Sequence, residues 1–126
     1  MNEINEAIEL YKEQMLGLIS EVEAKRNSYF DQLEQFSSSL ETTIKGRVFK
    51  ATQRFKNLEV KTEIYDETIS NFKNRVANFS FEDDGNFEEY VQIAEALERF
   101  GQQIDEDVTT LEGKLWYKYP YNQLVY

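Results

Sequence analysis

The sequence predicts an all-α protein, an antiparallel three-helix coiled-coil bundle with two long helices, a third C-terminal helix and an aromatic tail. Three observations support this fold class. Apolar residues recur at alternating steps of three and four through three long segments, which is the period of one helix face. Strand-like alternation and Asn-Gly hairpin signals do not occur. The 126 residues include 40% hydrophobic and 14% aromatic residues, which is enough for a packed core.

The first helix is predicted over residues 3–42. Its apolar pattern slips near Arg26, so one long helix and two shorter ones both fit it. The chain is expected to turn between Ser37 and Gly46, because the stretch SSSLETT favours helix ends and Ser38 to Glu41 resembles a capping box. The apolar face consists of Ile4, Ile8, Tyr11, Met15, Leu18, Val22, Tyr29, Leu33, Phe36, Leu40 and Ile44.

The second helix is predicted over residues 47–80, about nine turns. Its heptad pattern is the cleanest in the chain, with Thr62 as the single polar member. The pattern consists of Val48, Ala51, Phe55, Leu58, Thr62, Tyr65, Ile69, Phe72, Val76 and Phe79.

The third helix is predicted over residues 86–118. The stretch SFEDDGN before it is rich in turn formers, and Asn86 with Glu89 three residues on has the spacing of an N-terminal cap. Pro120, the only proline, prevents the helix from continuing much further. The apolar series is Phe87, Tyr90, Ala94, Leu97, Gly101, Ile104, Val108, Leu111 and Leu115.

Each apolar face is narrow, and a helix with one narrow apolar face is not stable alone in water. The three helices are therefore expected to form a single domain, residues 1–118, followed by an aromatic tail, residues 119–126. Because one small chain covers three such faces incompletely, a helical protein partner is expected, in a homo- or hetero-oligomer.

Charge differs between the segments. The net charge is −10 for the whole chain, and counting Asp, Glu, Lys and Arg gives −5 for residues 1–39, +3 for 40–79 and −8 for 80–126. Excess acid opposes binding to nucleic acid and to anionic membranes, so neither is an expected partner. In an antiparallel bundle, a basic middle helix can pair through its flanking charges with the acidic helices beside it. Acidic neighbours from this chain or a partner are expected for Lys45, Arg47, Lys50, Arg54, Lys56 and Lys61.

The chain contains no cysteine and no histidine. This excludes disulfides, thiolate chemistry, His-based acid–base catalysis and zinc sites with nitrogen or sulfur ligands. No catalytic motif occurs, so the sequence predicts a protein that is not an enzyme and has no cofactor and no metal site. The acidic start MNEINEAIELYKEQ lacks the basic region and apolar run of a secretory signal, which predicts a cytoplasmic product.

Two short motifs match a known family. Ile44-Lys45-Gly46 lies where a Trp-x-Gly turn would join two long helices, and Phe79 to Asp83 fits an F-x-x-x-D export signal. Over residues 1–83 the chain resembles the Trp-x-Gly family of helical hairpin proteins of type VII secretion and the helical accessory proteins of LXG toxins. It departs from the family pattern in having Ile44 for the tryptophan, in lacking the Y-x-x-x-D/E form and in adding a third helix.

The resemblance implies a non-catalytic interaction module that is a partner or targeting factor for an exported toxin, and secretion without a cleaved signal peptide. Its contact residues would include Ile44, Gly46, Phe79 and Asp83, with Phe49 or Phe55 anchoring the second helix.

Two other classes fit the same composition. One is a phage- or plasmid-encoded inhibitor that fills a basic cleft of a host protein with phosphate-like acids. The acids available for this role are Glu82, Asp83, Asp84, Glu88 and Glu89, or Asp105, Glu106 and Asp107. The other class is a structural or chaperone-like bundle of a virion or cytoskeletal assembly.

The last segment, LWYKYPYNQLVY, contains the only tryptophan and four of the eight tyrosines. These rings either fold back onto the bundle or anchor a partner, since Trp and Tyr combine apolar area with a polar group. Our hypothesis is a binding surface formed with the face that carries Ile44 and Phe49. Its tail residues are Trp116, Tyr117, Tyr119 and Tyr121.

Overall fold

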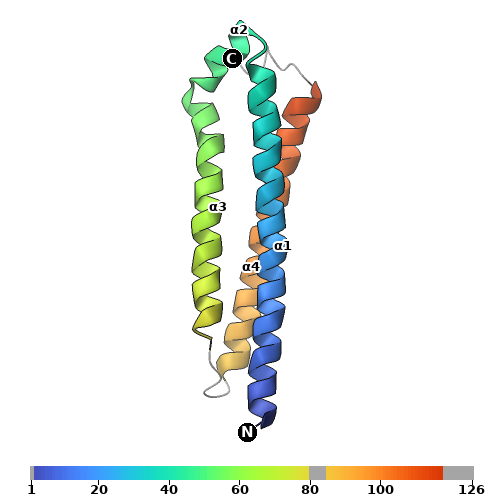
Figure 1. Cartoon of the computed structure of the whole chain (residues 1–126), viewed down its shortest axis with the longest axis vertical. Coiled ribbons are helices and arrows are strands. Elements are labelled where there is room, and N and C mark those ends of the chain that lie inside the picture. Colours follow the sequence, from blue (N-terminus) through green and yellow to red (C-terminus); the bar gives the residue numbers. More distant parts are fainter. Residues whose placement is uncertain (1, 80–84, 118–126) are drawn as a thin grey trace.

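The computed structural model describes residues 2–79 and 85–117, which form a long helical bundle (Figure 1). The four helices are α1 (Asn2–Leu40), α2 (Ile44–Lys50), α3 (Gln53–Ala77) and α4 (Gly85–Tyr117). α1 and α4 run in the same direction and pack side by side, and α3 runs in the opposite direction beside α1 (Figure 1). The short α2 crosses the end of the bundle where α1 leads into α3. The predicted all-α bundle is therefore confirmed.

The first and third predicted helices agree closely with α1 and α4. α1 continues through Arg26 without a break, which decides between the one-helix and two-helix readings. Arg26 leaves the apolar pattern because its guanidinium reaches α3. There Nε and Nη2 donate to the two carboxylate oxygens of Asp66 at 2.8 and 3.1 Å. α4 begins at Gly85, one residue before the predicted cap Asn86.

The predicted second helix is wrong at its start. Residues 47–80 were expected in one helix, but the chain forms α2 and then α3, with a break at Ala51 and Thr52. The Thr52 hydroxyl donates to the Phe49 carbonyl at 2.6 Å and accepts from the Phe55 amide at 3.4 Å, so it ends one helix and caps the next.

The predicted capping box is also wrong. α1 extends to Leu40, so Ser38 lies in its last turn, and Thr43 is the N-cap of α2. The turn itself falls at residues 41–43, inside the predicted window of Ser37 to Gly46.

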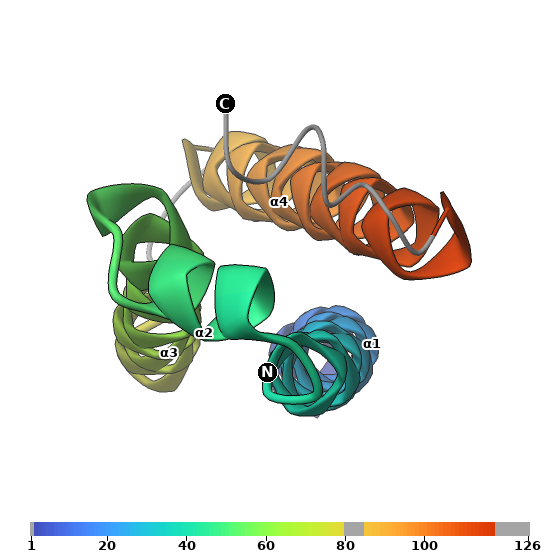
Figure 2. The same cartoon turned by 90° about the horizontal axis from the view of Figure 1, so that it is seen from above.

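The core runs along α1, which packs on α4 over most of its length and on α3 and α2 at its other side (Figure 2). Aromatic rings form part of the contact between α3 and α4. Phe100 of α4 lies 5.8 Å from Tyr65 and 6.1 Å from Phe72 between ring centroids. The buried apolar residues are Met15, Ile19, Val22, Tyr29, Leu33, Phe36, Leu40, Phe49, Phe55, Tyr65, Ile69, Phe72, Val76, Phe79, Ile93, Leu97, Ile104 and Leu111.

Four residues of the predicted apolar faces are instead exposed, which are Ile44, Val48, Ala51 and Phe87. Ile44 and Val48 lie on the outer side of α2, because the break at residues 51–52 turns α2 away from the axis of α3. Phe87 in the first turns of α4 is 54% exposed. The side chains of Ile4, Ile8 and Leu115 lie outside the described residues.

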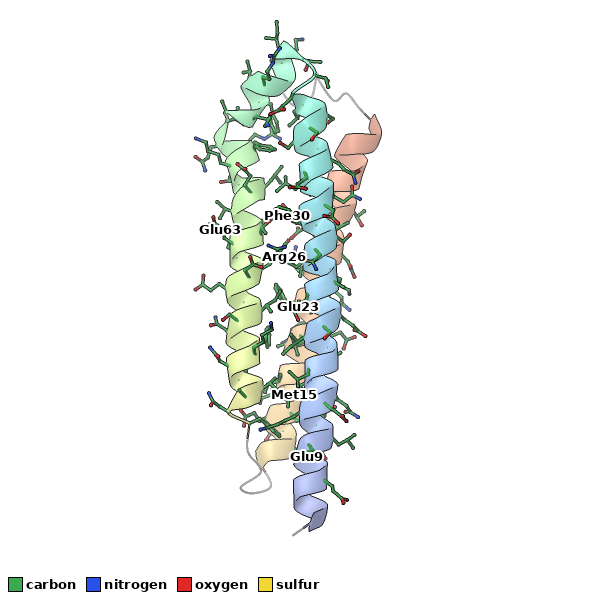
Figure 3. All side chains as sticks on the ribbon, viewed as in Figure 1. Glu9, Met15, Glu23, Arg26, Phe30 and Glu63 are labelled. Carbon is green, nitrogen blue, oxygen red and sulfur yellow. The ribbon has the colours of Figure 1, made fainter. Side chains whose placement is uncertain are left out.

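Ion pairs connect the helices at the edges of the core. Arg26–Asp66 and Lys73–Glu23 join α1 to α3, while Lys25–Asp105 joins α1 to α4. Figure 3 shows Glu23 and Arg26 on the side of α1 that is turned to α3. Such partly exposed pairs each contribute only about 0–1 kcal/mol, so they orient the helices while apolar burial stabilises them.

Candidate functional site

The candidate site is the end of the bundle formed by residues 41–56, which we call the α2 end. It comprises the turn after α1, the whole of α2 and the first turn of α3. Thr43 fixes the start of α2, since its hydroxyl accepts a hydrogen bond from the Gly46 amide at 2.9 Å. With Thr52 capping α3, both ends of this short helix are held by side-chain hydrogen bonds.

Gly46 is the point where α2 approaches α1 most closely. A Cβ atom placed on Gly46 would lie 2.0 Å from the Leu40 carbonyl oxygen and 2.7 Å from its carbonyl carbon. Backbone atoms cannot yield as a flexible side chain would, so only glycine fits this contact. The Ile44-Lys45-Gly46 motif therefore marks a tight reversal between two helices.

Phe49 anchors α2 to the bundle. Its ring lies 6.2 Å from that of Phe36 and 6.1 Å from that of Phe55, and it is 3% exposed. Phe79, another predicted contact residue, is 2% exposed and lies edge-on to Tyr11. Both phenylalanines belong to the core in this structure, and they stand at opposite ends of it.

The outer side of α2 is apolar and uncovered by the described residues. Ile44 is 74% exposed and Val48 is 58% exposed, and their four-residue spacing places them one above the other on the helix. Burying large aliphatic side chains lowers the free energy of a complex. Ile44 and Val48 are exposed, so a partner that covers them would gain this contribution. Sequence reasoning identified Ile44 but assigned Val48 to the core; the signal that could have found it is its i, i+4 relation to Ile44.

The α2 end is also basic. Lys50 pairs with Glu41 at 2.6 Å, and this contact holds the pKa of the Glu41 carboxyl below its usual range. The Arg47 guanidinium donates to the Thr43 carbonyl. Among the described residues, no carboxylate lies within 4 Å of Lys45 or Lys56. Among the ion pairs between described residues, the predicted pairing of these basic residues with acids of this chain is seen at Lys50 and at Lys61.

Lys61 belongs to a buried polar cluster between α3 and α4. The Asp107 carboxylate, which is 10% exposed, accepts hydrogen bonds from Lys61 at 2.9 Å, from Gln103 at 3.2 Å and from the Tyr65 hydroxyl. Burial, followed by the hydrogen bond to Asp107, raises the pKa of Tyr65. Three donors satisfy the carboxylate, and the cluster joins the two helices through hydrogen bonds.

A groove of about 290 Å³ lies between α1 and α3. Its charged side chains already pair with one another across it, as Arg26 does with Asp66 and Lys73 with Glu23. A ligand entering the groove would have to replace those ion pairs. The groove is lined by Glu23, Arg26, Asn27, Asp66, Ile69, Ser70 and Lys73.

The structure brings only some of the predicted contact residues together. Ile44 and Gly46 lie at the α2 end, and the backbone of α4 finishes at the same end of the bundle (Figure 1). The side chains of Trp116 and Tyr117, and all of Asp83, Tyr119 and Tyr121, lie outside the described residues.

The acids considered for phosphate imitation are partly engaged within the chain. Asp105 pairs with Lys25 at 2.8 Å and Asp107 is buried against Lys61. Within residues 2–79 and 85–117, acidic side chains form no cluster of the kind that holds a metal ion. Over the same part of the chain, none of the helices combines the length and the apolar character needed to span a membrane.

Comparison with family models, with curated proteins and with solved structures gave no match for this chain. The resemblance to the Trp-x-Gly hairpin proteins therefore stays a prediction from the Ile44-Lys45-Gly46 and Phe79–Asp83 motifs.

Proposed function

We propose that this chain is a non-catalytic protein-interaction module that docks a helical partner at the α2 end, and that the partner is an exported toxin of a type VII secretion system. The observation that carries the proposal is the exposed pair Ile44 and Val48 on a helix fixed at both ends. Helical partners are commonly recognised by apolar anchors at i and i+4.

The local structure supports a contact role for α2. Thr43, Gly46 and Phe49 hold the helix in place from beneath, through a cap, a close backbone approach and a buried ring. Little conformational freedom remains to be lost when a partner covers Ile44 and Val48, and such preorganisation favours affinity. Two aliphatic side chains alone make a small contact, so the proposed surface also includes Trp116, Tyr117, Tyr119 and Tyr121. The last turn of α4, which contains the first two, lies at the α2 end.

The toxin as partner rests on the family resemblance. In its support, Ile44-Lys45-Gly46 occupies a helix reversal in which glycine is required by the Leu40 backbone. Export together with the toxin, without a cleaved signal peptide, is part of the same proposal.

Co-expression with the amino-terminal domain of an LXG toxin encoded beside the gene tests this function. We expect a stable 1:1 complex by size-exclusion chromatography with light scattering. The variant Ile44→Asp/Val48→Asp should lose the complex and keep the melting temperature, because both side chains are exposed.

The matched control is Val60→Asp/Ile64→Asp, which changes an equally spaced pair on the outer side of α3 that is 43% and 53% exposed. This control should bind like the unchanged chain. Equal loss in both variants, or a gene neighbourhood that holds a phage tail cassette or a host-defence island and no toxin, would contradict the proposal.

A further inference from the structure

Charge is unevenly distributed along the long axis of the bundle. The α2 end contains one acidic residue, Glu41, and five basic ones, which are Lys45, Arg47, Lys50, Arg54 and Lys56. The opposite end is formed by the start of α1, the end of α3, whose last turn carries Arg75, and the start of α4 (Figure 1). We call it the acidic end, and its described acids are Glu6, Glu9, Glu13, Glu88 and Glu89.

The acidic end also exposes large apolar side chains. Leu10 is 50% exposed, Leu16 is 48% exposed and Phe87 is 54% exposed. Phe87 is held in place by Tyr11 and Tyr90, whose ring centroids lie 6.2 and 6.3 Å from its own. A shallow groove of about 560 Å³ covers the outer face of α1 here, lined by Glu6, Glu9, Leu10, Lys12, Glu13 and Leu16.

The two ends are therefore complementary in charge, and each offers apolar surface that the described residues leave uncovered. We infer that a second copy of this chain is an occupant of the α2 end, and that copies associate head to tail. Ile44 and Val48 of one copy then pack on the apolar side chains of the acidic end of the next. Lys45 and Arg47 lie close to acids such as Glu9 and Glu13. This inference rests on the proposed function in so far as both use the α2 end.

The net charge of −10 does not prevent such an association. α1 alone has 39 residues, which at about 1.5 Å per residue gives a rod of about 58 Å. The Debye length is about 8 Å at physiological ionic strength, so salt screens the repulsion between the acidic ends of neighbouring copies. Only the charges at the junction matter, and these are opposite in sign.

A contact between two different ends is heterologous and does not close on itself. Association should therefore yield a range of lengths that grows with concentration, and should weaken as salt rises. Sedimentation velocity over a range of concentrations, at about 0.05 and about 0.5 M salt, measures both properties.

Two charge-reversed variants make the test specific. In Lys45→Glu/Arg47→Glu a basic pair of the α2 end becomes acidic, and in Glu9→Lys/Glu13→Lys an acidic pair of the acidic end becomes basic. Each variant alone should need roughly tenfold higher concentration to associate, or more, which corresponds to about 1.4 kcal/mol per contact. An equimolar mixture should associate again, because the reversed pair on each variant then meets a pair of opposite sign on the other variant.

Two control variants separate the junction from net charge. Glu59→Lys/Glu63→Lys changes an exposed pair with the same spacing on α3, and Glu63 points away from the bundle (Figure 3). Arg99→Glu changes an exposed basic residue near the middle of α4, away from both ends, and makes half the charge change of the α2-end variant. Both controls should associate like the unchanged chain.

A strict monomer at high concentration, or a mixture of the two variants that fails to associate, would overturn the inference. If only a chain lacking residues 118–126 associates, the tail is the occupant of the α2 end, which also overturns it. Toxin binding is measured separately with Glu9→Lys/Glu13→Lys, whose α2 end is intact, so failure of the head-to-tail contact leaves the proposed function standing and distinguishable.

Discussion

Phe49 of α2 meets Phe36 of α1 edge-on, with ring centroids 6.2 Å apart, across the reversal that joins the two helices. This contact places a seven-residue helix, too short to be stable alone, firmly on the end of the bundle. Because Phe49 points inward, Ile44 and Val48 on the other side of α2 must point outward.

Replacing Phe49 by alanine should destabilise the fold by about 3–5 kcal/mol, because it removes a buried ring from between Phe36 and Phe55. Ile44→Ala should change stability by less than about 0.5 kcal/mol, since its side chain is largely exposed. Urea denaturation followed by circular dichroism compares the two. Similar losses for both would show that Ile44 is part of the core.

Alanine at Gly46 should cost about 1–3 kcal/mol, because the new Cβ would clash with the Leu40 backbone and push α2 outward. Gly17→Ala is the matched control. Nothing lies within 4 Å of a Cβ there, so that change should stabilise α1 by up to about 1 kcal/mol. Thermal melts that rank the two variants the other way would contradict the close approach.

The buried Asp107 should contribute far more to the stability of the fold than its exposed neighbour Asp105. Asp107→Ala leaves the Tyr65 hydroxyl without its acceptor and should cost about 1–3 kcal/mol, whereas Asp105→Ala breaks an exposed pair worth about 0–1 kcal/mol. A double-mutant cycle with Tyr65→Phe should give a coupling of about 0.5–3 kcal/mol. A coupling of zero would show that the two groups do not interact.

Alkaline pH should weaken the fold through Tyr29 and Tyr65. Burial raises the pKa of both phenols above the ordinary value of 10.0, so the unfolded chain loses these protons first as pH rises. Their contribution to stability is complete below about pH 10 and is lost above it. In Tyr29→Phe/Tyr65→Phe the urea midpoint should fall less steeply above pH 10; an unchanged slope would assign the effect to other groups.

The fold was largely predictable because long heptad patterns are strong signals, as α1 and α4 show. The break at Thr52 was not predictable from periodicity, since Val48, Ala51 and Phe55 keep the heptad spacing across it. The Thr52 hydroxyl causes the break by forming hydrogen bonds with backbone groups. Heptad counting does not detect such local hydrogen bonds.

The same limit affects the candidate site. Once α2 leaves the axis of α3, the inward position passes from Val48 to its neighbour Phe49, so one predicted core residue is exposed and one predicted contact residue is buried. The polar cluster at Asp107 also escaped prediction, because its members are separated by up to 46 positions along the chain. Only the packing of α3 and α4 brings them together.

Hydrogen–deuterium exchange of the free and the complexed chain tests most directly whether the α2 end is the contact surface. The amides of free α2, a short helix at the end of the bundle, should exchange faster than those of the long core helices. With partner at about 100 times its Kd, exchange in residues 44–50 should slow by up to about 100-fold, while residues 57–64, which carry Val60 and Ile64, should not change. Slowing confined to residues 57–64, with residues 44–50 unaffected, would contradict the account.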